Sequence, residues 1–429
     1  MAKTYRPYVP EQDLLLPPSL RDWLPEDHLA FFVSDLIDHL DLTAITTVYE
    51  ADDRGYPPYH PVMLTKVVVY AYCVGVFSSR KIQRRLIEDV PFRVLAAGNE
   101  PDFRTIADFR KRHLVALKGF FEQVLRLACE MGAPRVGRVA LDGSKIKANA
   151  SKHKAMSYGR MGETQRQLRE EVKDLLAQAE AADAAEDAEY GPDQRGDELP
   201  AELRRRESRL TLIREAKRAL EARAKDEATA AGKPAEPAKP EPKAQYNFTD
   251  PESRIMKSPD GFVQAYNVQV AVDELQLIVG QAVTQETNDK KQLMPMITII
   301  EQQSGDTPAQ LLADAGYCSD VNLTAIADTT IDAYISTRNQ KHGERPGPCP
   351  RGPLPQTATI VDRMSRKLHT KTGAAVYAAR KGIVEPVIGQ IKQARGFRQF
   401  LLRGFEKVQG EWSLVCTTHN ILKLYRLCL

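Results

Sequence analysis

The sequence predicts an α/β domain that is preceded by an all-helical domain and interrupted by a helical insertion. Residues 1–134 contain a series of short helix-like segments and turns, whereas the chain after residue 243 alternates strands and helices in an order typical of α/β proteins. Between these parts, the composition changes sharply to Ala, Glu, Lys, Arg and Gln. We expect a helical N-terminal domain at 1–134, an α/β domain at 135–151 and 244–429, and a charged helical insertion with a Pro-rich linker at 152–243.

The composition is that of a globular protein without a membrane segment. The chain has 429 residues, of which 42% are hydrophobic, and this is enough for a normal core. It contains no apolar run of about eighteen residues and no apolar stretch of a secretory signal at its N-terminus, so we expect a cytoplasmic protein. The six cysteines are scattered, which suggests neither a zinc site nor a disulfide framework.

Helix signals follow one another in the first 131 residues. A proline followed by two acids starts a helix at about Pro25–Leu40, and a second helix runs over about Pro61–Val76. A third begins near Ser78, whose hydroxyl can cap it, and a fourth is capped by Asp102 or Thr105. The last of these helices covers about 114–131. The order contains a pair of helices that resembles a helix-turn-helix.

Basic side chains cluster on two of these helices, although the net charge of the whole chain is only +3. One interpretation is contact with the DNA backbone, and the other is an ordinary solvated helix surface. The candidates for DNA contact in this domain are Arg80, Lys81, Arg84, Arg85, Arg110 and Lys111.

The insertion predicts two helical arms, at roughly 161–185 and 200–228, which suit an antiparallel hairpin. It either grips DNA or a second protomer, or it is a solvated excursion without a catalytic role. The following α/β part predicts two strands, a helix, a strand, a helix, a strand and two closing helices. Their expected positions are 262–273, 277–284, 293–300, 311–314, 321–327, 331–336, 373–393 and 405–427.

Three acids stand at the ends of apolar segments in this part. Asp142 ends the run Val139–Leu141, Asp314 ends a similar run, and Glu385 lies in the first closing helix. Buried carboxylates are unfavourable unless they are paired or bind metal, and oxygen ligands are typical of Mg²⁺ or Mn²⁺. The three acids are therefore candidate metal ligands, and the alternative is that each one caps a turn or forms a salt bridge. Helical spacing places Lys381 and Lys392 on the same side of the helix as Glu385.

Several motifs in this order resemble the DDE transposases of bacterial insertion sequences, in the branch with an InsH-like N-terminal domain. Shorter similarities lie at Asp250–Arg254 and Tyr266–Val270. The resemblance covers nearly the whole chain outside the insertion. Its main motifs are Leu141-Asp-Gly-Ser-Lys-Ile-Lys-Ala-Asn-Ala-Ser151, Ala313-Asp-Ala-Gly-Tyr317, Val384-Glu-Pro-Val-Ile-Gly-Gln-Ile-Lys392 and Arg403-Gly-Phe-Glu-Lys-Val-Gln-Gly-Glu-Trp412.

The resemblance implies an RNase H-like catalytic fold with a mixed sheet, in which Asp142, Asp314 and Glu385 hold two Mg²⁺ ions that Mn²⁺ can replace. It further implies end cleavage by water and strand transfer by the 3′-hydroxyl, on terminal inverted repeats and target DNA, by a nucleoid-associated homodimer. Lys392 matches the catalytic lysine of the family. The arginine position of the family holds Lys381 here, and Tyr377 and Arg380 each stand one residue early; we expect these three residues to contact DNA.

Two other functions remain compatible with the sequence: a structure-selective nuclease of the same fold, and a non-catalytic DNA-binding protein derived from a transposase. Smaller features receive structural interpretations. Trp412 and His419 share a helical face and are predicted to lie in the core rather than stack on a flipped base. Asp250 is expected to cap a turn, with an approach to the metals as the alternative.

Overall fold

The structure is a computed structural model. It describes residues 19–50, 57–133, 136–190, 201–230, 232–234, 238–258, 261–338 and 352–429. Among these residues, no helix combines the length and the apolar content needed to cross a bilayer.

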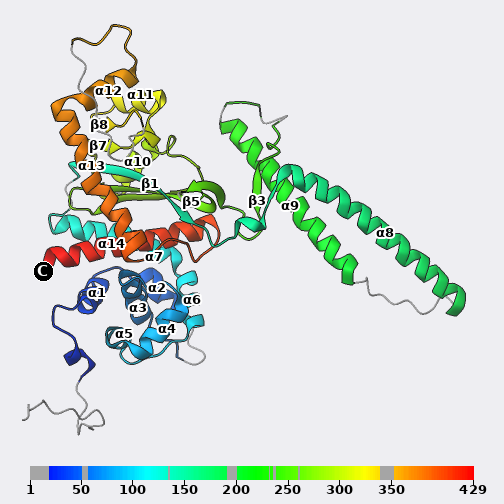
Figure 1. Cartoon of the computed structure of the whole chain (residues 1–429). Coiled ribbons are helices and arrows are strands. Elements are labelled where there is room, and N and C mark those ends of the chain that lie inside the picture. The colour runs from blue at the N-terminus through cyan, green and yellow to red at the C-terminus, as the bar shows by residue number, and fades with distance from the viewer. Residues whose placement is uncertain are drawn as a thin grey trace, which may run out of the picture.

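The N-terminal part is helical, as predicted (Figure 1). The carboxylate of Asp102 accepts a hydrogen bond from the backbone N–H of Thr105 at 2.7 Å, which confirms this cap, and Pro61 occupies the first turn of its helix. The predicted start at Pro25 is wrong, because the helix begins at Leu29 with His28 as its N-cap, and Ser78 makes no side-chain cap hydrogen bond. Two short helices at 43–50 and 90–95 were not predicted. A 3₁₀ turn (Leu20–Trp23) precedes α1 (Leu29–Asp38), α2 (Thr43–Glu50), α3 (Pro61–Cys73), α4 (Ser79–Glu88), α5 (Val90–Leu95), α6 (Phe103–Arg112) and α7 (Leu114–Glu130).

The α/β part is built on one mixed sheet of six strands, which confirms the predicted α/β class. The strand order is β4-β5-β1-β7-β8, and β6 also pairs with β5. β5 runs antiparallel to β1, β4 and β6, whereas β7 and β8 continue the sheet in parallel to β1. The strands are β1 (Arg138–Lys147), β4 (Arg254–Ser258), β5 (Gly261–Asp273), β6 (Ile278–Thr284), β7 (Gln310–Ala313) and β8 (Asp332–Ile335).

Helices flank this sheet. α13 contacts β1, β5, β7 and β8, while α10 and α14 contact β6 (Figure 1). A segment of π-helix at Gln390–Ala394 extends α13 directly. α12 was not predicted. The helices are α10 (Leu293–Ser304), α11 (Asp320–Ala327), α12 (Ile360–His369), α13 (Lys371–Gly389) and α14 (Phe405–Cys428).

α14 joins the two parts of the protein. It is buried along most of its length and packs against α7 and α3 on one side and β6 on the other. Trp412 is fully buried and the ring of His419 contacts the carbonyl of Gln276, so the predicted core roles of Trp412 and His419 are confirmed. One contiguous apolar cluster therefore runs from α1 to α14, and the N-terminal helices share their core with the sheet.

The insertion forms a separate arm, which projects from the body in Figure 1. Its long helices are α8 (Tyr158–Tyr190) and α9 (Ala201–Ala230), and its base is the antiparallel pair β2 (Ala155–Ser157) and β3 (Gln245–Asn247), preceded by a 3₁₀ turn at Lys152–Lys154. The arm has a small core of its own, made of Met161, Leu168, Leu210, Ile213, Ala216 and Leu220.

Candidate active site

Asp142 and Asp314 lie next to each other on neighbouring parallel strands. Ala140 of β1 is paired with Leu312 of β7, and each acid follows two residues later. The apolar run before Asp142 is buried, as expected, but β1 does not end at the acid: it continues to Lys147, with Asp142 opposite Val270 of β5. The predicted end of the strand at Asp142 is therefore wrong, because β5 supplies backbone partners for five further residues.

Asp314 begins the 3₁₀ turn Ala315–Tyr317. Its Oδ1 accepts a hydrogen bond from the backbone N–H of Gly316 at 2.9 Å. This hydrogen bond holds the Asp314 carboxylate at the end of β7, where the side chain is only partly buried.

Glu385 lies on α13 and is connected to Asp142 by an arginine. Arg380 Nη2 is 3.2 Å from Asp142 Oδ1, and Nη1 of the same guanidinium is 3.7 Å from Glu385 Oε1. Arg380 is only 10% exposed, whereas Glu385 is 52% exposed. The structure therefore brings Asp142, Asp314 and Glu385 to one region, with the Arg380 guanidinium between Asp142 and Glu385.

Burial and mutual repulsion disfavour the ionised form of the two aspartates. Burial raises the pKa of Asp142 to about 6, which the charge of Arg380 opposes and the charge of Asp314 reinforces. The pKa of Asp314 is also raised, mainly by burial. Carboxyl groups with pKa values raised by burial and by neighbouring acids are frequent at functional sites.

Two lysines, Lys392 and Lys145, lie in the same region as the acids. Lys392 lies on the π-helical segment, and its Nζ donates hydrogen bonds to Ser144 Oγ at 2.6 Å and to the carbonyl of Lys145 at 3.0 Å. Burial lowers the pKa of Lys392, and the charge of Asp142 counteracts this. Lys392 therefore lies against β1 beside Asp142, although 250 residues separate them in the sequence.

A fourth acid, Asp289, belongs to the same group. It lies in the loop between β6 and α10, and its negative charge contributes to the raised pKa of both Asp142 and Asp314. Asp289 is not among the predicted site residues, because an acid before a helix has an ordinary explanation as a helix start. We call Asp142, Asp289, Asp314 and Glu385 the acidic cluster.

The residues predicted to contact DNA beside Glu385 differ in their surroundings. Lys381 is exposed, as expected. Tyr377 is partly buried near Asp314 and Asp142, and burial raises its pKa. Arg380 pairs with the acids in this structure: its guanidinium lies 3.2 Å from Asp142 and 3.7 Å from Glu385, and the predicted contact of Arg380 with DNA stays a prediction.

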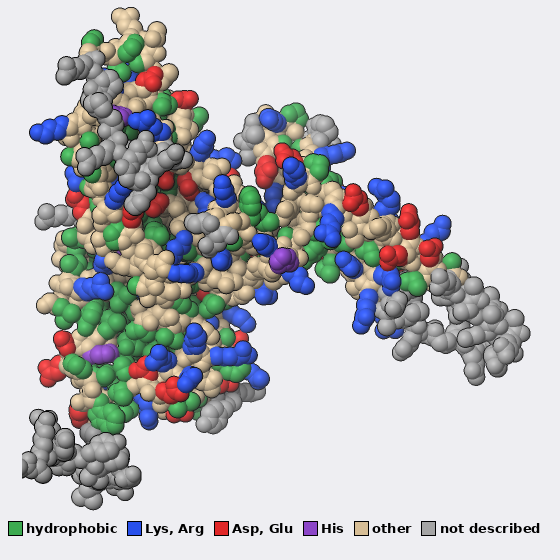
Figure 2. Space-filling model, in the orientation of Figure 1, with side chains coloured by type: hydrophobic (Ala, Val, Ile, Leu, Met, Phe, Trp, Pro, Cys, Tyr) green, Lys and Arg blue, Asp and Glu red, His purple; other side chains and the backbone are tan. Residues whose placement is uncertain are grey.

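The predicted basic surface of α4 and α6 is mostly exposed (Figure 2), but one member is buried. Arg110 is 7% exposed and donates hydrogen bonds to Tyr72 Oη, the carbonyl of Phe77 and Ser79 Oγ. Its assignment to DNA is therefore wrong, because its donors are used inside the domain. The exposed members are Arg80, Lys81, Arg84, Arg85 and Lys111.

Some exposed members already have acidic neighbours. Arg84 is 2.9 Å from Glu88 and Arg85 is 3.1 Å from Asp89, each one helical turn away. Such surface pairs are weak, about 0.5 kcal/mol, so phosphates can compete for these arginines.

Asp250 is buried, and its Oδ1 accepts a hydrogen bond from Tyr266 Oη at 2.9 Å, which supports a structural role of Asp250.

The acids fit a metal by chemistry and only partly by position. Their donors are carboxylate oxygens, the type that Mg²⁺ prefers, and Asp314 is close enough to Asp142 to raise the pKa of Asp142. Within the described ranges, however, no three His, Cys, Asp or Glu side chains converge tightly enough to hold a metal ion. Arg380 explains this arrangement, since its charge holds Glu385 in the absence of a bound cation.

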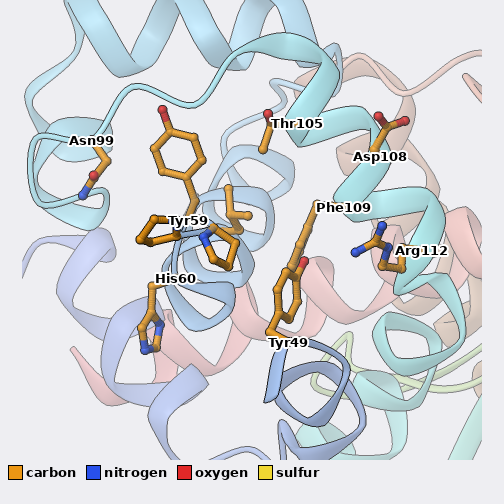
Figure 3. Close-up of a pocket in the computed structure, with 11 residues that line it drawn as sticks. Tyr49, Tyr59, His60, Asn99, Thr105, Asp108, Phe109 and Arg112 are labelled. Atoms are coloured by element: carbon orange, nitrogen blue, oxygen red, sulfur yellow. The ribbon is translucent and has the colours of Figure 1, made fainter. Parts of the chain in front are cut away.

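A pocket of about 830 Å³ lies elsewhere, among the N-terminal helices (Figure 3). Tyr49, Tyr59, Phe109 and Arg112 are among the residues that line it. None of its lining residues belongs to the acidic cluster, so we assign it no part in the chemistry.

Two family models match parts of the chain. One, described as "Transposase domain (DUF772)", matches residues 18–112, which include α1 to α6. The other, described as "Transposase DDE domain", matches residues 354–425, which include Glu385 and Lys392. Asp142 and Asp314 lie outside both matched ranges. No curated protein and no solved structure matches the chain.

Proposed function

We propose that this chain is a DDE transposase of the insertion-sequence type, because transposase-domain models match residues 18–112 and 354–425. In this proposal it cuts the ends of its own element and joins the freed 3′-hydroxyls to target DNA in a metal-dependent reaction. Its DNA partners are the terminal inverted repeats and the target duplex. The protein acts on them as a homodimer, because two element ends have to be joined, and it works at the bacterial nucleoid.

We assign an RNase H-like fold to the α/β part. The order of the strands supports this assignment. β1, β5 and β6 are antiparallel neighbours, and β7 and β8 then extend the sheet in parallel to β1. Helices pack around the sheet, and α13, which carries Glu385, contacts β1, β5, β7 and β8.

The observation that carries the proposal is the meeting of the three sequence-predicted acids at one region. Asp142 and Asp314 follow paired residues of β1 and β7, and Arg380 links Asp142 to Glu385. These three acids are the residues that would hold Mg²⁺ or Mn²⁺. Two such ions, when bound, activate the attacking oxygen and stabilise the leaving oxygen of a phosphodiester.

The chain's own cations supply the remaining functions in this proposal. Lys392 lies beside Asp142 and holds a compact positive charge, which suits a phosphate of the cleaved strand. The exposed arginines of α4, Arg80 and Arg84 among them, contact the DNA backbone outside the cut site. Tyr377 and Lys381 lie on α13, the helix that also carries Glu385, and bind DNA next to the acids.

The test compares single-turnover cleavage of a duplex that carries the inverted repeats flanking this gene, with Mg²⁺ and with EDTA. We expect Asp142→Asn, Asp314→Asn and Glu385→Gln to reduce the rate constant by at least about a hundredfold, because each removes a ligand charge without changing side-chain size. Glu274→Gln is the matched control, since Glu274 is half exposed and pairs with Arg138 away from the cluster.

The outcomes separate the competing functions. Cleavage and joining that disappear in the three variants but persist in the control support the transposase. Nicking without joining of 3′-hydroxyl ends would identify a nuclease instead. Undiminished cleavage in all three variants would refute the assignment of the acids, and tight DNA binding by the parent without any metal-dependent cleavage would refute the enzymatic function.

A further inference from the structure

The Asp289 carboxylate is hydrogen-bonded to two side chains of β5 and does not cap a helix. Its Oδ1 accepts hydrogen bonds from Asn267 Nδ2 and Gln269 Nε2, both at 2.7 Å. The next helix, α10, starts at Leu293 and receives no side-chain cap from its N-cap residue Gln292. The Asp289 carboxylate therefore points to the sheet and away from the ordinary role of an acid before a helix.

Two glycines leave room for this carboxylate. A methyl group on Gly143 would overlap Asp289 Oδ1 and would lie 2.7 Å from Gln269 Nε2. A methyl group on Gly316 would lie 2.9 Å from Asp314 Oδ1 and 3.2 Å from Asp289 Oδ2. Asp289 thus fills the space directly beside the backbone that follows Asp142 and beside the turn that carries Asp314.

Asp289 also connects Lys145 of β1 with the Asp314 turn. Lys145 Nζ is 3.7 Å from Asp289 Oδ1, and both side chains are less than one-fifth exposed. On the other side, Gln269 donates to Asp289 and accepts a hydrogen bond from the Tyr317 hydroxyl, and Tyr317 is the last residue of the Asp314 turn.

A second link joins the same two segments. The side-chain amide of Asn322 donates to the carbonyl of Lys290, next to Asp289, at 2.6 Å and to the carbonyl of Tyr317 at 2.7 Å. The loop before α10 and the turn after β7 are therefore fastened together at two points. These hydrogen bonds restrain the position of the loop relative to the turn.

We propose that Asp289 is a positioning residue of the site, which holds the Lys145 ammonium and the Asp314 turn in place beside Asp142. The proposal deepens the transposase function and rests on it. Loss of the Asp289 charge releases Lys145 and leaves the backbone fold intact, because an asparagine keeps an oxygen that accepts from Asn267 and Gln269. Asp289 acts through these neighbours and makes no contact with the DNA.

Two measurements on Asp289→Asn test the proposal, one without any catalysis. First, the metal-free, DNA-free protein is acetylated briefly, and mass spectrometry follows the labelling rate of Lys145. We expect this rate to rise by about tenfold, since the ion pair that restrains Nζ is gone. Second, single-turnover cleavage gives a rate constant and an amplitude. We expect the rate constant to fall by about ten- to a hundredfold with an unchanged amplitude and DNA affinity.

The amplitude separates positioning from simple unfolding, because a loss of folded protein lowers the amplitude and leaves the rate constant as it was. Glu286→Gln is the matched control: Glu286 lies in the same loop but pairs with the exposed Lys291. Unchanged Lys145 labelling overturns the proposal, and so does faster labelling with an unchanged cleavage rate constant. If the parent cleaves no DNA, the transposase function fails, while the labelling still decides whether Asp289 holds Lys145.

Discussion

Asp142→Asn should stabilise the metal-free protein at neutral pH. In the folded chain, burial raises the pKa of Asp142 from 3.8 to about 6, so ionising this carboxylate opposes folding. A pKa difference of this size corresponds to about 3 kcal/mol. Asparagine resembles the neutral acid in size and polarity, and the substitution removes the ionisation. We therefore expect the free energy of unfolding to rise by about 3 kcal/mol at pH 7.5.

The gain should depend on pH in a defined way. Between pH 3.8 and about 6, the folded parent retains the proton of Asp142 while the unfolded chain has lost it. This group therefore lowers the stability of the parent by up to about 1.4 kcal/mol for each pH unit in that window, and its contribution is constant above it. The advantage of the variant should be absent below pH 4, grow up to about pH 6 and then stay level.

Urea unfolding from pH 4 to pH 8, followed by the fluorescence of the buried Trp412, measures this effect. Asp328→Asn is the control, because Asp328 is exposed at the end of α11, and its effect should stay within about 0.5 kcal/mol. Saturating Mg²⁺ should stabilise the parent more than the variant, by about 2.7 kcal/mol at a hundredfold excess over the dissociation constant. A variant that is less stable than the parent at pH 7.5 without metal would refute the argument.

Three further predictions concern the scaffold. Arg110→Met should lower the free energy of unfolding by about 3 kcal/mol in urea titrations, since it leaves buried hydrogen-bond partners unpaired. Arg80→Met should leave this free energy unchanged and reduce the salt slope of DNA binding by about one. Equal effects of the two substitutions would contradict these roles. Trp412→Ala should cost about 4 kcal/mol by the same titration, and a change below 1 kcal/mol would argue against its core position. Replacing the arm between Ser157 and Gln245, which are paired directly, by Asn-Gly should leave the thermal midpoint of the body within a few degrees, because the arm has its own core; a body that unfolds would show that the arm is needed.

Local signals in the sequence were sufficient for many elements. Proline at the first turn defined the start of α3, and Asp102 the start of α6. The alternation of apolar residues located β5 to within one residue, but the half-buried strand that it predicts is wrong, because residues 264–273 are buried on both faces of the sheet. Short elements such as α5 and β4 carry too few residues to show a period, and they were missed.

Contacts between distant segments determined which charged side chains are buried and which partners they have. Arg80 and Arg110 look alike in the sequence, but Arg110 is buried because Tyr72 of α3, Ser79 of α4 and Phe77 of the loop between them supply acceptors. The sequence likewise did not show that Arg380, and not Lys381, is the partner of Glu385, because this pairing depends on the contact of the guanidinium with Asp142 on β1.

The sequence by itself determined the α/β class, the helical N-terminal part and arm, and the identity of three acids at the site. These features depend on local patterns and on motifs of consecutive residues. Only the tertiary structure added Asp289 to the acids, placed Lys392 against β1 and removed Arg110 from the DNA surface. Electrostatic energies depend on distance and burial, and strand pairing and side-chain packing set both between residues that are far apart in the chain.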